Sequence, residues 1–303
     1  DPRNQELDLI AKTVMRKKDF KTSNKEFPVE SKRFSASVLN EGGAMPGVGA
    51  IHIDEIEPTL AELENALGIN LRGNVLGSVG KRQFSGDIDV ALQIEPEEIK
   101  PFVEKLKKTS AIKDIAQSSV IMTKVEIKNF DKNKSDGRPR TGFVQVDFMP
   151  GDPGWLKTYY HSPSETESKY KGVFRNILIA SIASAFDRQD SKDTIADGRP
   201  KESLRWMWSP RDGLIKVKRT PKPNKAGTGY TKQSNNEIIA GPFKTLDEIS
   251  SQLNMEPKDL NSFESLMDAI KKSYNPTIVQ KIIDDFKNNG TIKDIGIPAE
   301  LEN

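Results

Sequence analysis

Residues 76–92, which read LGSVGKRQFSGDIDVAL, constrain the fold of this chain more than any other segment. Asp87 and Asp89 alternate with Ile88 and Val90 in an otherwise apolar run. In an extended strand, residues two apart project from the same face, so the two carboxylates converge while the apolar side chains enter a core. The segment therefore predicts a half-buried strand that presents an acidic pair.

The residues before this pair add the features of a phosphate site. Two carboxylates on one face repel each other unless a cation lies between them, and Mg²⁺ is commonly held by one or two carboxylates together with substrate phosphates. Gly77 and Ser78 predict a small turn whose backbone N–H groups are open to phosphate oxygens, and Lys81 and Arg82 add positive charge. The alternative is a simple turn followed by solvated charge at a strand edge.

This segment resembles the signature of the DNA polymerase beta-like nucleotidyltransferases, most closely that of family X DNA polymerases. The resemblance implies an α/β (α+β) fold with a mixed sheet and flanking helices. It also implies a third carboxylate on a later strand, and Asp147 within residues 142–150, GFVQVDFMP, matches that pattern. The spacer from Ser78 to Asp87 is one residue shorter than in the family X members, and the resemblance covers about a third of the chain.

The resemblance further implies a two-metal phosphoryl transfer with Mg²⁺, or Mn²⁺ in its place. Asp87 and Asp89 would bind both ions, and Asp147 would help to hold the ion that activates the attacking hydroxyl, with pyrophosphate leaving in line. The residues that it assigns to the nucleotide are Gly77, Ser78, Lys81, Arg82, Ser85 and Gly86.

The predicted function is transfer of a nucleoside monophosphate from an NTP or dNTP to a hydroxyl, with the 3′ end of DNA or RNA as the preferred acceptor. A small-molecule adenylyltransferase or an oligonucleotide cyclase would use the same three aspartates. A non-catalytic structural or binding protein that retains the fold is the third alternative. The sequence leaves the acceptor and the oligomeric state open.

Composition shifts divide the chain into four expected parts. Residues 1–50 are polar and rich in Lys and Glu, which predicts an arm and linker. Residues 51–152 form the catalytic domain, residues 153–244 combine a helical core with a basic β segment, and residues 245–303 form a small helical region.

Within the catalytic domain, residues 50–53 alternate like a short strand, and Pro58 fits the first turn of a helix that Gly68 ends. We expect residues 74–76 and 90–92 to be strand-like, a helix at 97–108, and a hairpin built from 120–130 and 142–149. Its connection, residues 131–141, carries four basic residues that either contact a polynucleotide or are merely solvated.

Beyond residue 150, the segment 173–186 is apolar on all sides, which predicts a buried helix. Tyr159, Tyr160, His161 and Ser162 lie where nucleotidyltransferases carry residues that meet the incoming nucleotide, although packing aromatics are the favoured interpretation. Further helices are expected in 245–254, 262–273 and 277–289.

Residues 199–232 carry ten Lys and Arg side chains against two acidic ones, whereas the whole chain has a net charge of +2. A local basic band is typical of a surface that meets phosphates, and Lys216, Lys218 and Arg219 are its candidate nucleic-acid contacts. Trp206 and Trp208 share a face if this part is a strand, which suits either base stacking or core packing.

The composition also excludes several kinds of site. The chain has no cysteine, so it has no disulfide, no zinc–thiolate site and no thiol nucleophile. It has two histidines, too few for a histidine-rich metal site. No segment is long and apolar enough to cross a bilayer, and no charged leader precedes an apolar core. These features predict a soluble, cytoplasmic protein without a membrane partner.

Overall fold

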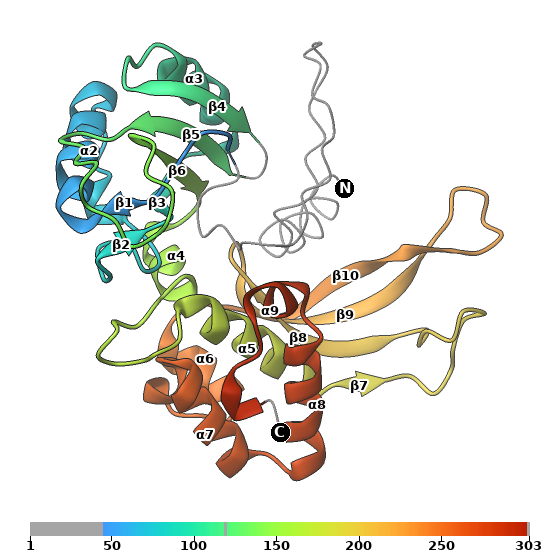
Figure 1. Ribbon diagram of the computed structural model, residues 1–303. Helices are drawn as coiled ribbons and strands as arrows, with labels where there is room; N and C mark the ends of the chain where they lie inside the picture. The colour runs from blue at the N-terminus through green and yellow to red at the C-terminus, as the bar shows by residue number, and fades with distance from the viewer. Residues whose placement is uncertain (1–44, 118–119, 302–303) are drawn as a thin grey trace.

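The structure, a computed structural model, describes residues 45–117 and 120–301, so almost all of the expected arm 1–50 lies outside the described residues. Figure 1 shows two bodies, which are joined through the short helix α4 (Pro153–Tyr159). A small apolar cluster of Leu76, Ala91 and Leu156 packs where α4 meets the first body. Helices and strands are mixed throughout, which confirms the predicted α/β class.

The first body is a four-stranded sheet with helices packed on it. Its elements are β1 (Ile51–His52), α2 (Ile53–Leu67), the 3-10 turn η1 (Arg72–Asn74), β2 (Phe84–Ser85), β3 (Asp87–Leu92), α3 (Pro96–Lys107), β4 (Ile112–Gln117), β5 (Ile121–Glu126) and β6 (Phe143–Pro150). The strand order is β3-β6-β5-β4, with β3 and β6 parallel and the other neighbours antiparallel. The predicted hairpin and the helix at 97–108 are therefore confirmed.

Alternation along β3 positions its charges as the sequence predicts. Ile88 and Val90 are fully buried, whereas Asp87 and Asp89 are only half-buried. The neighbouring strand β6 is buried from Val144 to Phe148, as expected for a strand between two others. Apolar side chains of α2 and α3 complete this core: Leu60, Leu63, Leu67, Phe102, Val103 and Leu106.

The predicted start of the first helix is wrong. The strand ends at His52, and α2 begins at Ile53, five residues before Pro58. His52 caps the helix, because its side chain accepts from Asp54 N–H while the Glu55 carboxylate accepts from His52 N–H. This reciprocal cap satisfies N–H groups that a helix start leaves open, so it sets the boundary in place of Pro58.

The strand expected at residues 74–76 is also wrong. Asn74 closes the turn η1, and only Val75 pairs with β3, through an isolated bridge to Val90. The Leu76 N–H donates to Asp89 O at 2.8 Å, so a single contact point rather than a strand brings the following turn to β3.

The second body begins with α4 and is built around α5 (Gly172–Ala185), which is buried along most of its length as its all-round apolarity predicts. Its other helices are α6 (Leu246–Gln252), η2 (Pro257–Leu260), α7 (Phe263–Ser273), α8 (Pro276–Lys287), α9 (Gly290–Ile295) and η3 (Ala299–Leu301). The helices predicted from 245 to 289 are confirmed, and α9 is an addition. None of the helices in the described ranges has the length and apolarity that a bilayer span requires.

An antiparallel sheet extends from this helical core. It contains β7 (Gln189–Asp190), β8 (Ser203–Ser209), β9 (Gly213–Pro223) and β10 (Tyr230–Phe243) in the order β10-β9-β8-β7. β8 pairs with β9 only as far as Arg219, so the two-stranded ribbon of residues 220–235 continues alone. Figure 1 shows this ribbon projecting from the body, and we call it the arm.

Candidate functional site

The structure brings the three predicted carboxylates together. Asp87 and Asp89 project from β3, and Asp147 lies on β6, where the parallel register sets it beside Asp89. One ligand oxygen from each of the three lies within 4.8 Å of the others. Asp147 is buried and the other two are half-buried, so three like charges lie close together at a site that is only partly open to water.

This donor set fits a hard divalent cation. Carboxylate oxygens are the ligands that Mg²⁺ prefers, and it binds them at about 2.0–2.1 Å, so two oxygens on one ion lie about 4 Å apart or less. The oxygens within 4.8 Å of one another need only a small side-chain adjustment to reach that spacing. The three carboxylates repel one another at this distance, and a cation bound between them lowers that repulsion.

Gln145 supports Asp147, and sequence reasoning missed it. The Gln145 side chain is buried, and its Nε2 donates to Asp147 Oδ1 at 2.7 Å. Its Oε1 accepts from Met45 N–H at 3.0 Å, which fixes which end of the amide faces the carboxylate. Gln145 lies two residues before Asp147 on one strand face, so the i, i+2 spacing was the signal that could have found it.

The Gly77–Ser78 turn lies against the same carboxylates. Gly77 has φ of +69°, in the left-handed region that glycine adopts without strain, and a Cβ placed there would be 3.9 Å from Asp89 Oδ2. Of the other residues predicted to bind the nucleotide, Gly86 connects β2 to β3. Ser85 is buried in β2, and its Oγ has no hydrogen-bond partner among the described residues.

Lys81 and Arg82 extend toward the second body. Lys81 Nζ donates to Ser162 O at 2.6 Å, and Arg82 Nη1 pairs with Glu165 at 3.0 Å. Burial lowers the pKa of Lys81, with the Glu167 carboxylate acting in the opposite direction. Nε and Nη2 of Arg82 are buried and donate to no acceptor within the described ranges. In this arrangement both cations link the turn to residues 162–165.

Among the aromatic candidates, Tyr160 is the one near the carboxylates. Burial raises its pKa well above the usual tyrosine value, and Tyr159 and the nearby carboxylates of Asp89 and Asp147 act in the same direction. Its hydroxyl therefore stays protonated and remains a hydrogen-bond donor at neutral pH. Tyr159 instead stacks on Trp208 with ring centroids 5.1 Å apart, in agreement with the packing interpretation.

His161 and Ser162 follow this pair. His161 Nε2 lies 3.0 Å from Asn261 Oδ1, and burial, together with the cations of Arg175 and Lys81, lowers the pKa of the imidazole. Ser162 Oγ accepts from Gly172 N–H at 2.9 Å, at the start of α5. Both side chains thus make structural contacts in the second body.

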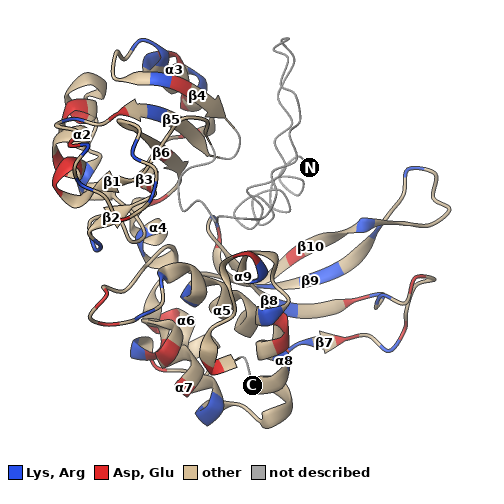
Figure 2. Ribbon diagram, viewed as in Figure 1, with Lys and Arg blue, Asp and Glu red and all other residues tan. Residues whose placement is uncertain are grey.

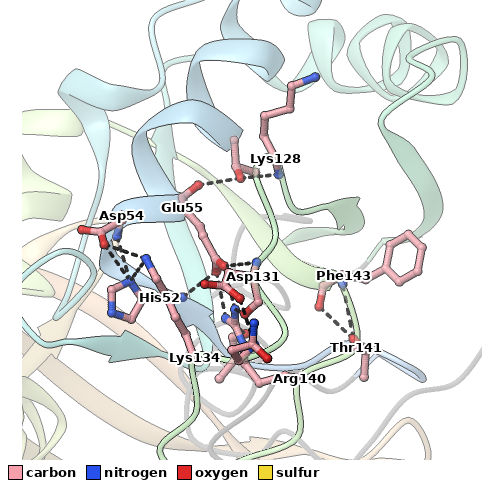
Figure 3. A network of polar contacts seen from close by, with 12 residues as sticks. His52, Asp54, Glu55, Lys128, Asp131, Lys134, Arg140, Thr141 and Phe143 are labelled. Carbon is pink, nitrogen blue, oxygen red and sulfur yellow. Dashed lines mark hydrogen bonds and ion pairs between the residues drawn. The ribbon is translucent and has the colours of Figure 1, made fainter.

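Three of the four cations of loop 131–141 pair with acids of the first body, and Figure 3 shows two of them, Lys134 and Arg140. Arg140 donates to both carboxylate oxygens of Glu55, at 2.6 and 2.8 Å, and the two side chains are only 5% and 2% exposed. Lys134 pairs with Asp54 at 2.7 Å, and Arg138 pairs with Asp136. These pairs favour a structural role for the loop over contact with a polynucleotide.

The cations at the base of the arm also pair with acids, like those of loop 131–141. Lys216 pairs with Asp187 at 2.6 Å and Lys218 pairs with Glu202 at 2.7 Å, so two of the three candidate nucleic-acid contacts already have acidic partners. Trp206 and Trp208 are 5% and 7% exposed and belong to the core of the second body, which decides between stacking and packing in favour of packing. Figure 2 shows the basic residues continuing outward along the arm.

Comparison with protein-family models and with curated proteins finds no match to this chain. The resemblance to nucleotidyltransferases therefore depends on residues 76–92 and 142–150, and on what their geometry can do chemically.

Proposed function

We propose that this protein is a metal-dependent nucleotidyltransferase that transfers a nucleoside monophosphate from a nucleoside triphosphate to a hydroxyl. The observation that carries the proposal is the convergence of Asp87, Asp89 and Asp147 from adjacent parallel strands, with ligand oxygens within 4.8 Å of one another. A surface cluster of acids needs no such register, whereas a site for phosphoryl transfer needs several oxygen ligands held at one point.

In this proposal the three aspartates hold Mg²⁺, or Mn²⁺, which would lower the pKa of the attacking hydroxyl and neutralise charge on the triphosphate. Gln145 keeps the Asp147 carboxylate in place through the bond from its Nε2. The Gly77–Ser78 turn offers backbone N–H groups to phosphate oxygens beside Asp89. The protein thus mainly positions reactants and complements charge, as phosphoryl transfer requires.

The acceptor in the proposal is the 3′ end of a polynucleotide. The resemblance to family X polymerases and the basic band at 199–232 both favour this choice over a small molecule. An intracellular location, where triphosphates and Mg²⁺ are available, belongs to the same proposal.

The test is transfer of label from each radiolabelled nucleoside triphosphate in the presence of Mg²⁺, with and without single-stranded or primed DNA and RNA, resolved on a gel. We expect label on an oligonucleotide, and we expect Asp89→Asn to reduce it to background. Asp268→Asn removes an exposed carboxylate in α7 with the same change in charge and should leave transfer intact.

Label found only in small products would replace the polynucleotide acceptor with a small molecule or a cyclic oligonucleotide. Transfer that survives in Asp89→Asn would contradict the assigned site. No transfer under any condition, from protein that unfolds cooperatively, would favour the non-catalytic alternative.

A further inference from the structure

We propose that the hollow between the arm and the loop before β8 binds single-stranded polynucleotide, with one base stacked on Tyr230. This inference deepens the proposed function, because it names a surface that binds the acceptor polynucleotide at nucleotides distant from its reacting 3′ end. Its role in catalysis rests on that function, whereas the binding itself can be measured separately.

The hollow is formed where the sheet narrows to two strands. Residues 191–202 run beside the arm, and Arg199 Nη2 donates to Thr231 O at 2.7 Å, which attaches the loop to the arm. Between them lies an open cavity of about 390 Å³, a volume in the usual range for small-molecule sites. Its polar or aromatic lining residues are Lys201, Thr220, Tyr230 and Asn235, and Pro221 and Pro223 also line it.

The charge of the arm and of its base is of one sign. Residues 213–236, which comprise both, contain six Lys and Arg residues and no Asp or Glu. Within the described ranges, Lys222, Lys225 and Lys232 have no ion-pair partner, in contrast to Lys216 and Lys218 at the base. The neighbouring loop carries Asp193, Asp197 and Glu202, but these pair with Lys201, Arg199 and Lys218. The three lysines of the arm therefore remain available to an extended polyanion.

Tyr230 selects among polyanions. Tyr230 is 48% exposed, the largest exposed fraction among the large apolar and aromatic residues of the described ranges. Single-stranded nucleic acids are commonly held by a cationic groove together with exposed aromatic rings on which bases stack. Asn235 can hydrogen-bond a base edge, and Lys222, which has no ion-pair partner in the described ranges, can contact a phosphate. An acidic peptide would leave the ring without a planar partner.

The hollow also favours a single strand over a duplex. A base must leave its stack to lie against a ring between a loop and a ribbon, and this costs least where the base is unpaired. The sequence pointed to Trp206 and Trp208 for stacking, but both belong to the core. The arm supplies the aromatic ring that those two cannot.

The test is fluorescence anisotropy of the full chain with labelled oligo(dT) and oligo(U) of about 20 nucleotides, without triphosphate or Mg²⁺. We expect Tyr230→Ala to weaken binding about 10-fold, and Tyr230→Phe, which keeps the ring, to bind like the wild type. Lys222→Gln should weaken binding and reduce the slope of affinity against salt by about one. Lys271→Gln, an exposed lysine on α7, is the matched control and should change neither.

Equal affinity of Tyr230→Ala and the wild type would overturn the proposal. So would displacement of the oligonucleotide by polyglutamate with the same dependence on Tyr230, since that would identify an acidic protein as the partner. Preference for a duplex over both single strands would overturn it as well.

The same assay separates this inference from the proposed function. Asp268→Asn, the control of the transfer assay, should bind the oligonucleotides with an unchanged Kd, because Asp268 lies on α7, which does not line the hollow. Tyr230-dependent binding without nucleotide transfer would remove the proposed function and keep the site. Transfer to an oligonucleotide without Tyr230-dependent binding would keep the proposed function and remove the binding site at Tyr230.

Discussion

Two segments of this chain are rich in Lys and Arg, and the structure surrounds them differently. In residues 131–141, Arg140 is buried against Glu55, and Lys134 and Arg138 also pair with acids. In residues 213–236, Lys216 and Lys218 at the base of the arm pair with acids. Lys222, Lys225 and Lys232, on the arm itself, have no ion-pair partner within the described ranges. The sequence alone treats both as basic surfaces.

The difference teaches where a local excess of charge indicates a binding surface. Glu55 is 85 residues from Arg140, so the partner that accounts for this cation is invisible to local counting. The arm projects away from the rest of the molecule, which leaves its cations to solvent or to a partner (Figure 2). The comparison therefore predicts that charge in the first segment stabilises the fold, whereas charge in the second affects binding.

The largest expected effect is on stability. Glu55→Gln removes the carboxylate but leaves Arg140 buried, and loss of one partner of a buried ion pair costs about 3–5 kcal/mol. The free energy of unfolding, measured with urea, should fall by that amount. Asp136→Asn, which breaks the more exposed pair with Arg138, should cost less than about 1 kcal/mol.

The pH dependence of unfolding provides a control for Glu55→Gln. Burial alone raises the pKa of Glu55, but the hydrogen bonds from Arg140, Asp131 and His52 outweigh it, so the net pKa is lowered. A carboxyl group with a lowered folded-state pKa stabilises the protein above the ordinary glutamate pKa of about 4.3, and this contribution is lost as the pH falls through the folded-state value. The wild type and Glu55→Gln should therefore differ fully at neutral pH and converge in acid. A gap that stays constant with pH would contradict the assignment.

The second effect concerns the connection from the paired segment to the candidate site. Arg140 Nη1 donates to Ala50 O. Five residues earlier in the chain, the Met45 N–H donates to Gln145 Oε1, and Gln145 in turn donates to Asp147. Gln145→Leu should weaken metal binding or activity about 10- to 100-fold, the usual cost of losing a group that orients a metal ligand.

Mn²⁺ binding measured by electron paramagnetic resonance, together with the Mg²⁺ dependence of nucleotide transfer, would check this effect. Gln93→Leu, at an exposed glutamine just after β3, is the control. Equal Mn²⁺ affinity in the wild type and Gln145→Leu would show that Asp147 does not need this support.

The smallest expected effect contrasts two lysines of the arm. Lys232→Gln should reduce the salt slope of oligonucleotide binding by about one, because a lysine without an acidic partner is available to a phosphate. Lys218→Gln breaks a pair with Glu202 and should leave the slope unchanged, with a change in unfolding free energy below about 1 kcal/mol. Equal slopes for the two variants would remove the distinction between the base and the tip of the arm.

Sequence periodicity predicted much of the secondary structure because it reflects local physics. The two-residue period of β3 and the all-round apolarity of α5 led to the correct strand and the correct buried helix. The start of α2 was missed because histidine is an unusual capping residue, and Pro58 gave a more familiar signal. Trp206 and Trp208 could not be assigned, since a strand face is either buried or exposed according to what packs on it.

By itself, the sequence determined that Asp87 and Asp89 share a strand face and that Asp147 lies in a second apolar strand. Only the tertiary structure decided that these strands are parallel neighbours in a register that sets Asp147 beside Asp89, and that Gln145 and Met45 support it. It likewise decided which cations are neutralised and which are not. The physical reason is the same in both cases: side-chain direction follows from local backbone geometry, whereas charge pairing and strand register depend on residues that are distant in the chain.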